Sequence, residues 1–208
     1  GHDSLNDNTE GQFNIAMGSN ALALNTTGDN NTALGTGALY SNTTADNVTA
    51  VGRSALNQNT TGARNVAVGA NALDANTTAN DVTAVGMNSL TSNTTGGSNA
   101  ACGSATLASN TEGDNNTAVG KAALYSNTTA DDNTACGKDA LFSNTTGTAN
   151  TAVGMRSSQS NTTGGGNTSL GHSSLYTNST GANNVACGLF AMYYNTTGGL
   201  NTAIGRDA

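Results

Sequence analysis

The chain has no proline and no tryptophan, and charged residues make up only 9% of its 208 residues. Aromatic residues account for 4%, whereas 27 residues are glycine, and asparagine and threonine recur throughout. The low charged fraction argues against an ordinary globular domain, in which about 25% of residues are charged. Few aromatic residues together with many polar residues and glycines can indicate disorder. This composition is also typical of repeat proteins with regular turns, and periodicity decides between the two.

Basic residues and long apolar runs are also scarce. Six basic residues against thirteen acidic ones give a net charge of −7, which disfavours nucleic acids and anionic membranes as partners. No apolar run approaches the roughly 20 residues that span a bilayer, so membrane insertion is not expected. The chain shows no signal peptide and starts at glycine, which predicts a mature form or an excerpt of a longer solenoid.

What the chain does have is a repeat of 17 residues. A glycine recurs at this interval from Gly18 to Gly205 without insertion or deletion, and Gly1 falls in the same register. With that glycine as position 0, the repeat is G-x-x-A-L-x-x-N-T-T-G-x-x-N-T-A-V over positions 0 to 16. The array comprises twelve whole units and the start of a thirteenth, and we treat residues 1–208 as one domain.

The length and composition of the unit predict an all-β fold. Seventeen residues are too few for a helical hairpin repeat, which needs roughly 33, and glycine, asparagine and threonine are poor helix formers. Two short β segments fit at positions 13–16 and 2–6, with corners at N-T-T-G and at the position-0 glycine. We therefore predict a β-solenoid, a parallel β-roll or β-helix of twelve 17-residue coils stacked at roughly 4.8 Å.

Strand alternation sets positions 14 and 16 on one face and position 15 on the other. We assign position 16 and the leucine of position 4 to the interior. The cysteines occupy position 16 two and three coils apart, roughly 10 and 14 Å by strand spacing, too far for disulfides; we expect small buried hydrophobes. The predicted core includes Leu22, Leu39, Leu56, Leu73, Val51, Val68, Val85, Cys102, Cys136 and Cys187.

Asparagine occupies position 7 in all twelve units. Stacked asparagines form side-chain hydrogen-bond ladders in cross-β assemblies, whereas N-T-T is also an N-glycosylation sequon. A glycan every 4.8 Å or so along one edge would be severely crowded, which favours the ladder without excluding glycans. Complete sequons start at Asn25, Asn42, Asn59, Asn76, Asn93, Asn127, Asn144, Asn161, Asn178 and Asn195, with further sequons at Asn47 and Asn167.

The segment Asn116-Thr117-Ala118-Val119-Gly120 and its eleven copies resemble the N-S-V-A-I-G-like motif in the head repeats of trimeric autotransporter adhesins. The fuller pattern N-T-A-V-G-x-x-A-L-x-x-N-T-T-G is similar to repeats in phage and large-virus fibre proteins and bacterial surface proteins. The resemblance covers the whole chain. It implies short left-handed β-roll coils, a trimer and an extracellular role.

No catalytic or metal constellation is apparent. The only histidines, His2 and His172, are ten coils apart, so no catalytic triad can assemble within one chain. Metal-type cysteine spacing is absent, and the aspartates of positions 11 and 12 do not follow the calcium-binding β-roll pattern. We expect solvated turn aspartates, no cofactor and no enzymatic activity. Aromatic residues at position 5 form a stripe that could contact a sugar or a second chain.

The leading hypothesis is a structural rod, a segment of an extracellular or cell-surface filament or adhesin shaft. Its expected partner is itself, head to tail or laterally, with lateral contacts through the small residues of positions 3 and 15. One alternative is an ice- or carbohydrate-binding solenoid that uses threonine or asparagine ladders. Another is a viral or phage tail fibre, which shares the fold.

Overall fold

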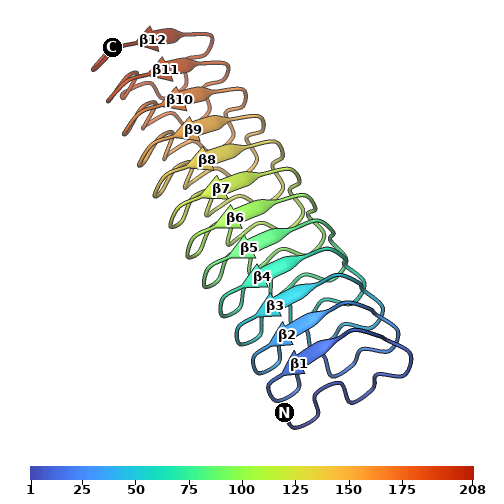
Figure 1. Ribbon diagram of the computed structural model, residues 1–208. Helices are drawn as coiled ribbons and strands as arrows, with labels where there is room; N and C mark the ends of the chain where they lie inside the picture. The colour runs from blue at the N-terminus through green and yellow to red at the C-terminus, as the bar shows by residue number, and fades with distance from the viewer.

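A computed structural model describes residues 1–208, and it is a β-solenoid without helices. One strand per coil forms a single twelve-stranded parallel sheet in the order β1 to β12, so strands adjacent in sequence are adjacent in space. Figure 1 shows the strands stacked along one side of a rod with the termini at opposite ends. The strands are β1 Ile15–Met17, β2 Thr32–Leu34, β3 Thr49–Val51, β4 Val66–Val68, β5 Thr83–Val85, β6 Ala100–Cys102, β7 Thr117–Val119, β8 Thr134–Cys136, β9 Thr151–Val153, β10 Thr168–Leu170, β11 Val185–Cys187 and β12 Thr202–Ile204.

The pairing register equals the sequence repeat. Thr117 pairs with Thr134, Ala118 with Ala135 and Val119 with Cys136, and every other strand pair follows the same 17-residue offset. Each coil contains 17 residues and contributes one strand, which is followed by the position-0 glycine. Because the coil length is constant, every residue lies next to its own counterpart in the neighbouring coil. The predicted period and parallel stacking are confirmed, and the strand predicted at positions 13–16 forms over positions 14–16.

The interior side of the strand is position 15, not position 16. Ala33, Ala50 and Ala67 are completely buried, and the residues on either side of them in the strand are partly exposed or exposed. Alternation along the strand allows only one of the two faces to point inward. The prediction that Val51, Val68, Val85, Cys102, Cys136 and Cys187 are core residues is therefore wrong; they lie on the outer face.

The leucines of position 4 are in the core, as predicted. Leu22, Leu39, Leu56 and Leu73 are completely buried. Their backbone is left-handed, with φ between 51° and 56°, a conformation that costs a non-glycine residue about 1–3 kcal/mol. Burial of a leucine side chain contributes about 1.5–3 kcal/mol, so the two effects are of similar size. The leucine keeps this conformation only because the stack encloses its side chain.

The expected second strand at positions 2–6 does not form. Residues at positions 2 and 4, such as Asn71 and Leu73, are left-handed, and alternating left-handed residues prevent an extended strand. The segment nevertheless bonds from coil to coil: the amide of Leu73 donates to the carbonyl of Ser89, 2.9 Å away, and that of Ala75 to Thr91. Of 136 backbone hydrogen bonds, only 22 lie within the regular strands, so the turn segments supply most of the axial bonding.

The position-0 glycine is required by both geometry and space. Gly120 has φ +122°, and a Cβ built there would lie 2.7 Å from the carbonyl carbon of Gly137 in the next coil. Only glycine, which lacks a Cβ, can adopt this φ and also let the backbones of adjacent coils approach so closely. The glycine therefore turns the chain out of the strand while letting adjacent coils stack at full contact.

Small side chains fill the remaining interior. One cluster of 26 buried alanines, leucines and valines runs from Ala21 to Ala152, and it stops where serine replaces the usual apolar residues. Ser158 and Ser169, at positions 4 and 15, are joined by a 2.8 Å hydrogen bond, and Ser157 donates to Ser169 at 2.6 Å. Two departures from the repeat thus contact each other inside the rod, and the Ser169 hydroxyl that accepts from Ser158 itself donates to the carbonyl of Thr151.

Candidate functional site

The outer surface of the sheet extends through all twelve coils. Side chains of positions 14 and 16 point outward from every strand, with threonine common at 14 and an aliphatic residue or cysteine at 16. We call this surface the Thr–Val face. It comprises Ile15, Thr32, Thr49, Val66, Thr83, Ala100, Thr117, Thr134, Thr151, Thr168, Val185 and Thr202 with Met17, Leu34, Val51, Val68, Val85, Cys102, Val119, Cys136, Val153, Leu170, Cys187 and Ile204.

The Thr–Val face is uncharged along its whole length. None of its residues is acidic or basic, and Val68, Val119 and Val153 expose 36%, 44% and 39% of their surfaces. Eleven intervals of about 4.8 Å and a width of about 10 Å give an area on the order of 500 Å². One of its two ranks is mostly threonine, so the face is uncharged without being wholly apolar. Surface patches of about this size are often functional.

All three cysteines are on this face. Cys102 and Cys136 are exposed, Cys187 is partly exposed, and all three are free thiols. The structure pairs none of them in a disulfide, and their predicted burial is wrong. The nearly constant alanine of position 15 was the sequence signal for which side of the strand faces inward. A closely packed interior tolerates little variation in side-chain size, whereas position 16 varies among Met, Leu, Val, Cys and Ile.

The position-7 asparagines form an unbroken ladder inside the rod. Each side-chain Nδ2 donates to the Oδ1 of the previous coil, as in Asn127 to Asn110 at 2.7 Å, and eleven such bonds link Asn8 to Asn195. The second Nδ2 hydrogen is donated to the carbonyl of position 10 in the same coil, as in Asn127 to Ala130 at 3.0 Å. The predicted Asn ladder is therefore present, and both amide hydrogens are used.

A second asparagine ladder, at position 13, is not among the features predicted from the sequence. Asn150 accepts a hydrogen bond from the backbone amide of Asn167 at 3.0 Å, and its Nδ2 donates to the carbonyl of Gly164 at 2.9 Å. That carbonyl also accepts from Asn161 of the position-7 ladder, so the two ladders meet at one corner. Recurrence of asparagine in ten of twelve units was the signal for it.

The acidic residues of the corner are structural rather than merely solvated. Asp46 accepts a 2.7 Å bond from the backbone amide of Asp29, and Asp131 accepts one from Asp114. At position 12, Arg64 donates two bonds to Asp81, 2.6 and 2.8 Å long. These hydrogen bonds, reinforced by the Arg64 charge, hold the pKa of Asp81 below its usual value. No group of three or more His, Cys, Asp and Glu side chains is placed to hold a metal ion.

Aromatic side chains of position 5 stack along the rod. The rings of Tyr125 and Phe142 are 5.1 Å apart and those of Tyr176 and Tyr193 are 4.9 Å apart, nearly parallel in both pairs. Within each pair the two rings turn one face toward each other. Those facing surfaces are closed to a sugar ring.

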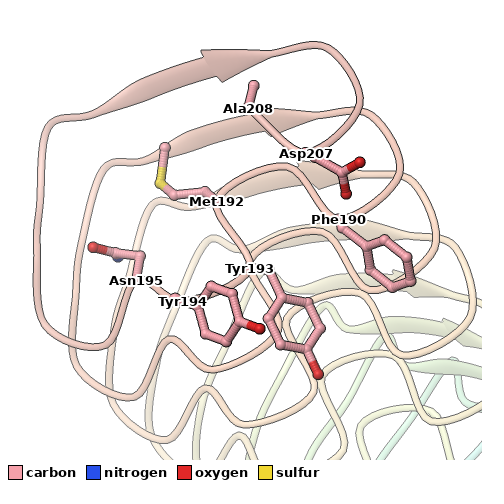
Figure 2. A pocket seen from close by; sticks show the side chains of 7 residues that line it. All are labelled: Phe190, Met192, Tyr193, Tyr194, Asn195, Asp207 and Ala208. Atoms are coloured by element: carbon pink, nitrogen blue, oxygen red, sulfur yellow. The ribbon is translucent and has the colours of Figure 1, made fainter.

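A hollow of about 500 Å³ lies at the end of the stack (Figure 2). It is bordered by Met192, Tyr193, Tyr194 and Asn195 at positions 4 to 7, and the amide of Met192 donates to the carbonyl of Ala208 at 2.7 Å. In inner coils the same positions are covered by the next coil. The hollow therefore lies where the next coil covers these positions in inner coils, and it is not an enclosed ligand cavity.

The sequence matches no protein-family model, and no curated protein or solved structure gives a significant match to the chain. No helix of the structure is long and apolar enough to cross a membrane. The ladders, the outer face and the corner positions are therefore the features from which we infer a function.

Proposed function

We propose that the chain is a rod segment of an extracellular filament, such as the shaft of a fibre or adhesin. The observation that supports this proposal is the axial ladder of position-7 asparagines, which runs through every coil without a break. Each inner coil is bonded to two neighbours by the same contacts, so stability grows with the number of coils and no coil is independent. Such a body resists bending and extends by repetition, which suits a spacer between two functional ends.

We propose that the partner of the Thr–Val face is a second copy of this chain, packed side by side in parallel register. The face carries no charge, and its ranks repeat at the same interval in every copy. Two faces of about 500 Å² would bury roughly 1,000 Å², the lower limit for a specific interface. A trimer, which the adhesin-like repeats imply, would use the same outward side chains. Positions 3 and 15 are buried, so the lateral contact expected there is withdrawn.

Negative-stain imaging and sedimentation velocity test both parts. We expect rods that associate laterally, and we expect Val119→Lys with Val153→Lys to give single rods with unchanged circular dichroism. The matched control is Ala149→Lys, at an exposed corner position that already accommodates Arg64. Wild-type chains that sediment as monomers at micromolar concentration would contradict the lateral contact, and compact particles instead of rods would contradict the rod.

The cysteines report the register of the two chains. In parallel register β6 of one chain, which carries Cys102, lies opposite β6 of the other, whereas in an end-aligned antiparallel pair β6 lies opposite β7, which has no cysteine. A chain that retains only Cys102 should therefore crosslink to itself under mild oxidation. Absence of this crosslink in an associated sample would exclude parallel register.

A second candidate function is binding to ice, and the geometry of the Thr–Val face favours it over binding to carbohydrate. Threonine hydroxyls and methyls of position 14 and aliphatic groups of position 16 form two straight ranks on one sheet surface, repeating at about 4.8 Å. Such an array presents an ordered pattern to water. Thermal hysteresis in a wild-type solution that is lost in Thr117→Lys would support ice binding, and its absence at millimolar concentration would exclude it.

A further inference from the structure

Fourteen N-glycosylation sequons occur in the chain, and they fall at different positions of the coil. Ten begin at the position-7 asparagines and one begins at Asn167, in position 13. The remaining three begin at position 12: Asn30-Asn31-Thr32, Asn47-Val48-Thr49 and Asn115-Asn116-Thr117. Glycans are joined to the side-chain Nδ2 of asparagine and are bulky surface groups, so the state of that atom in the folded rod decides which sequons can carry one.

The position-7 sequons cannot carry a glycan in the folded rod. Asn59 and Asn144 are completely buried, and each Nδ2 donates one bond to the coil below and one to its own position-10 carbonyl. A sugar on that nitrogen would remove one donor and place a saccharide between stacked coils. Asn167 is subject to the same restriction, since it is 2% exposed and its Nδ2 donates to Asn150 and Gly181.

Position 12 has the opposite properties. Asn30, Asn47 and Asn115 are exposed, and no hydrogen bond involves their side chains. Their backbone is left-handed, with φ of 58–59°, a conformation in which asparagine is enriched. Each lies at a bend just before its strand, with the side chain outside the ladders.

Position 12 carries side chains that range in size from glycine to arginine and phenylalanine. All twelve of its residues are exposed, and they include Phe13, Arg64 and Leu200 as well as Gly166. The neighbours of Asn115 in this rank are Ser98 and Asp132, both short and polar. A group attached at this corner therefore projects into solvent without displacing another coil.

We propose that Asn30, Asn47 and Asn115 are the N-glycan acceptor sites of the folded rod, with an N-acetylglucosamine-linked oligosaccharide as the modifying group. The side-chain Nδ2 of each asparagine forms a bond to C1 of the first sugar of a lipid-linked pyrophosphate oligosaccharide, the donor class. The C1–O bond to the pyrophosphate breaks, the lipid pyrophosphate leaves with the bonding electrons, and Nδ2 loses one proton to solvent. The proposal rests on the extracellular role proposed above. Each position-7 sequon then consists of a buried ladder asparagine followed by an exposed threonine at position 9.

The spacing of the three sites sets the expected occupancy. Asn30 and Asn47 are in adjacent coils, roughly 5 Å apart along the rod, whereas Asn115 is four coils beyond Asn47, roughly 19 Å away. Two oligosaccharides on adjacent coils would collide near their attachment points. We therefore expect full occupancy at Asn115 and one glycan shared between Asn30 and Asn47, which is two glycans per chain.

The chain itself shows how to silence the buried sequons without disturbing the ladder. Glu10 and Glu112 replace threonine at position 9, which breaks the sequons of Asn8 and Asn110 while both asparagines stay in the ladder. The ten position-9 threonines are exposed and their hydroxyls make no hydrogen bond. Glutamine at these ten positions has the length of glutamate and adds no charge, so it removes the sequons and leaves Asn and Nδ2 untouched.

The test is secretion of this ten-glutamine variant from a eukaryotic host cell, followed by glycosidase treatment and mass spectrometry of the folded, protease-resistant fraction. We expect a glycosidase-sensitive mobility shift of two glycans, mapped to Asn115 and to Asn30 or Asn47. Gln at all three asparagines should abolish the shift and leave the circular dichroism unchanged. A folded fraction without glycans at position 12, or with a glycan on Asn167, would overturn the proposal.

The unmodified wild-type chain provides the second arm. During secretion its position-7 sequons are exposed before folding, and we expect chains modified there to be protease-sensitive because their coils cannot close. Folded wild-type rods carrying a position-7 glycan would also overturn the assignment. Protein produced in a bacterial cytoplasm carries no N-glycans, and imaging of this protein tests the rod alone. The two experiments therefore distinguish failure of the proposed glycan sites from failure of the proposed rod.

Discussion

Asn76 donates one hydrogen bond to Oδ1 of Asn59 at 2.7 Å and a second to the carbonyl of Ala79 at 3.3 Å, with its side chain completely buried. The first bond crosses between coils and the second closes the corner of its own coil. A single side chain therefore fixes both the local turn and the stacking. Its removal leaves the acceptor of Asn59 and one donor of Asn93 without partners.

The first prediction concerns this ladder. Asn76→Ala should destabilise the rod by about 2–4 kcal/mol, because buried groups left unpaired cost about 1–3 kcal/mol each. The matched control is Asn115→Ala, which removes an exposed side chain from a position where Ala149 is already accommodated. Thermal unfolding followed by circular dichroism measures both. Equal midpoints for the two variants would show that the ladder contributes nothing.

The second prediction tests the inward and outward registers. Leu73→Asp should unravel neighbouring coils because it buries an unpaired charge, and Leu73→Ala should cost about 2–5 kcal/mol. Val68→Asp, five residues earlier on the outer face, should leave the isolated rod folded. Hydrogen exchange of amides in adjacent coils reports the difference. Protection lost in Val68→Asp and retained in Leu73→Asp would reverse the assignment.

The repeat made the period, the parallel register and the core leucines predictable, because a fixed glycine interval forces each residue to stack on its counterpart. The side of the strand that faces inward was harder to predict. Val51 and Ala50 are both apolar, and hydrophobicity alone favoured valine for the interior. The interior is too narrow for that choice: Ala50 and the leucines fill it. The constant size of position 15 carried more information than its hydropathy.

The left-handed leucines could not be predicted from local preference. Leucine rarely adopts positive φ, so positions 2–6 resembled an extended segment. Only the assembled stack shows that Leu73 at φ 56° directs its side chain into the core. Similarly, Asn42 and Asn47 both begin an N-x-T sequon, although Asn42 is completely buried and Asn47 is exposed. Accessibility is a property of the coil, and the motif does not encode it.

The third prediction concerns the glycine that ends each strand. Gly120→Ala should destabilise the rod severely, by more than about 3 kcal/mol, because the new Cβ meets the backbone of Gly137 at a φ that alanine rarely adopts. Gly97→Ala is the matched control, since its φ is unstrained and its Cβ would lie 3.3 Å from the carbonyl of Asn80. We expect that variant to stay within about 1 kcal/mol of wild type. Chemical denaturation compares the two.

The fourth prediction is a pH dependence at Asp74, a partly buried residue of position 5. Burial raises the pKa of its carboxyl above the usual 3.8, and the nearby charge of Arg53 only partly opposes the effect. The folded state therefore holds this proton more tightly than the unfolded chain, and this residue's contribution becomes more favourable as pH falls through the raised pKa toward 3.8. Asp74→Asn removes the penalty at neutral pH.

We expect Asp74→Asn to raise the unfolding midpoint at pH 7, by no more than about 1 kcal/mol in free energy because the side chain is partly solvated. The advantage over wild type should shrink as pH falls and vanish below the usual pKa of Asp, where both side chains are neutral. Asp46→Asn is the control: its carboxylate accepts the backbone amide of Asp29 at 2.7 Å, and an amide oxygen can accept the same bond. A gain from Asp74→Asn that is independent of pH would assign the effect to packing instead of charge.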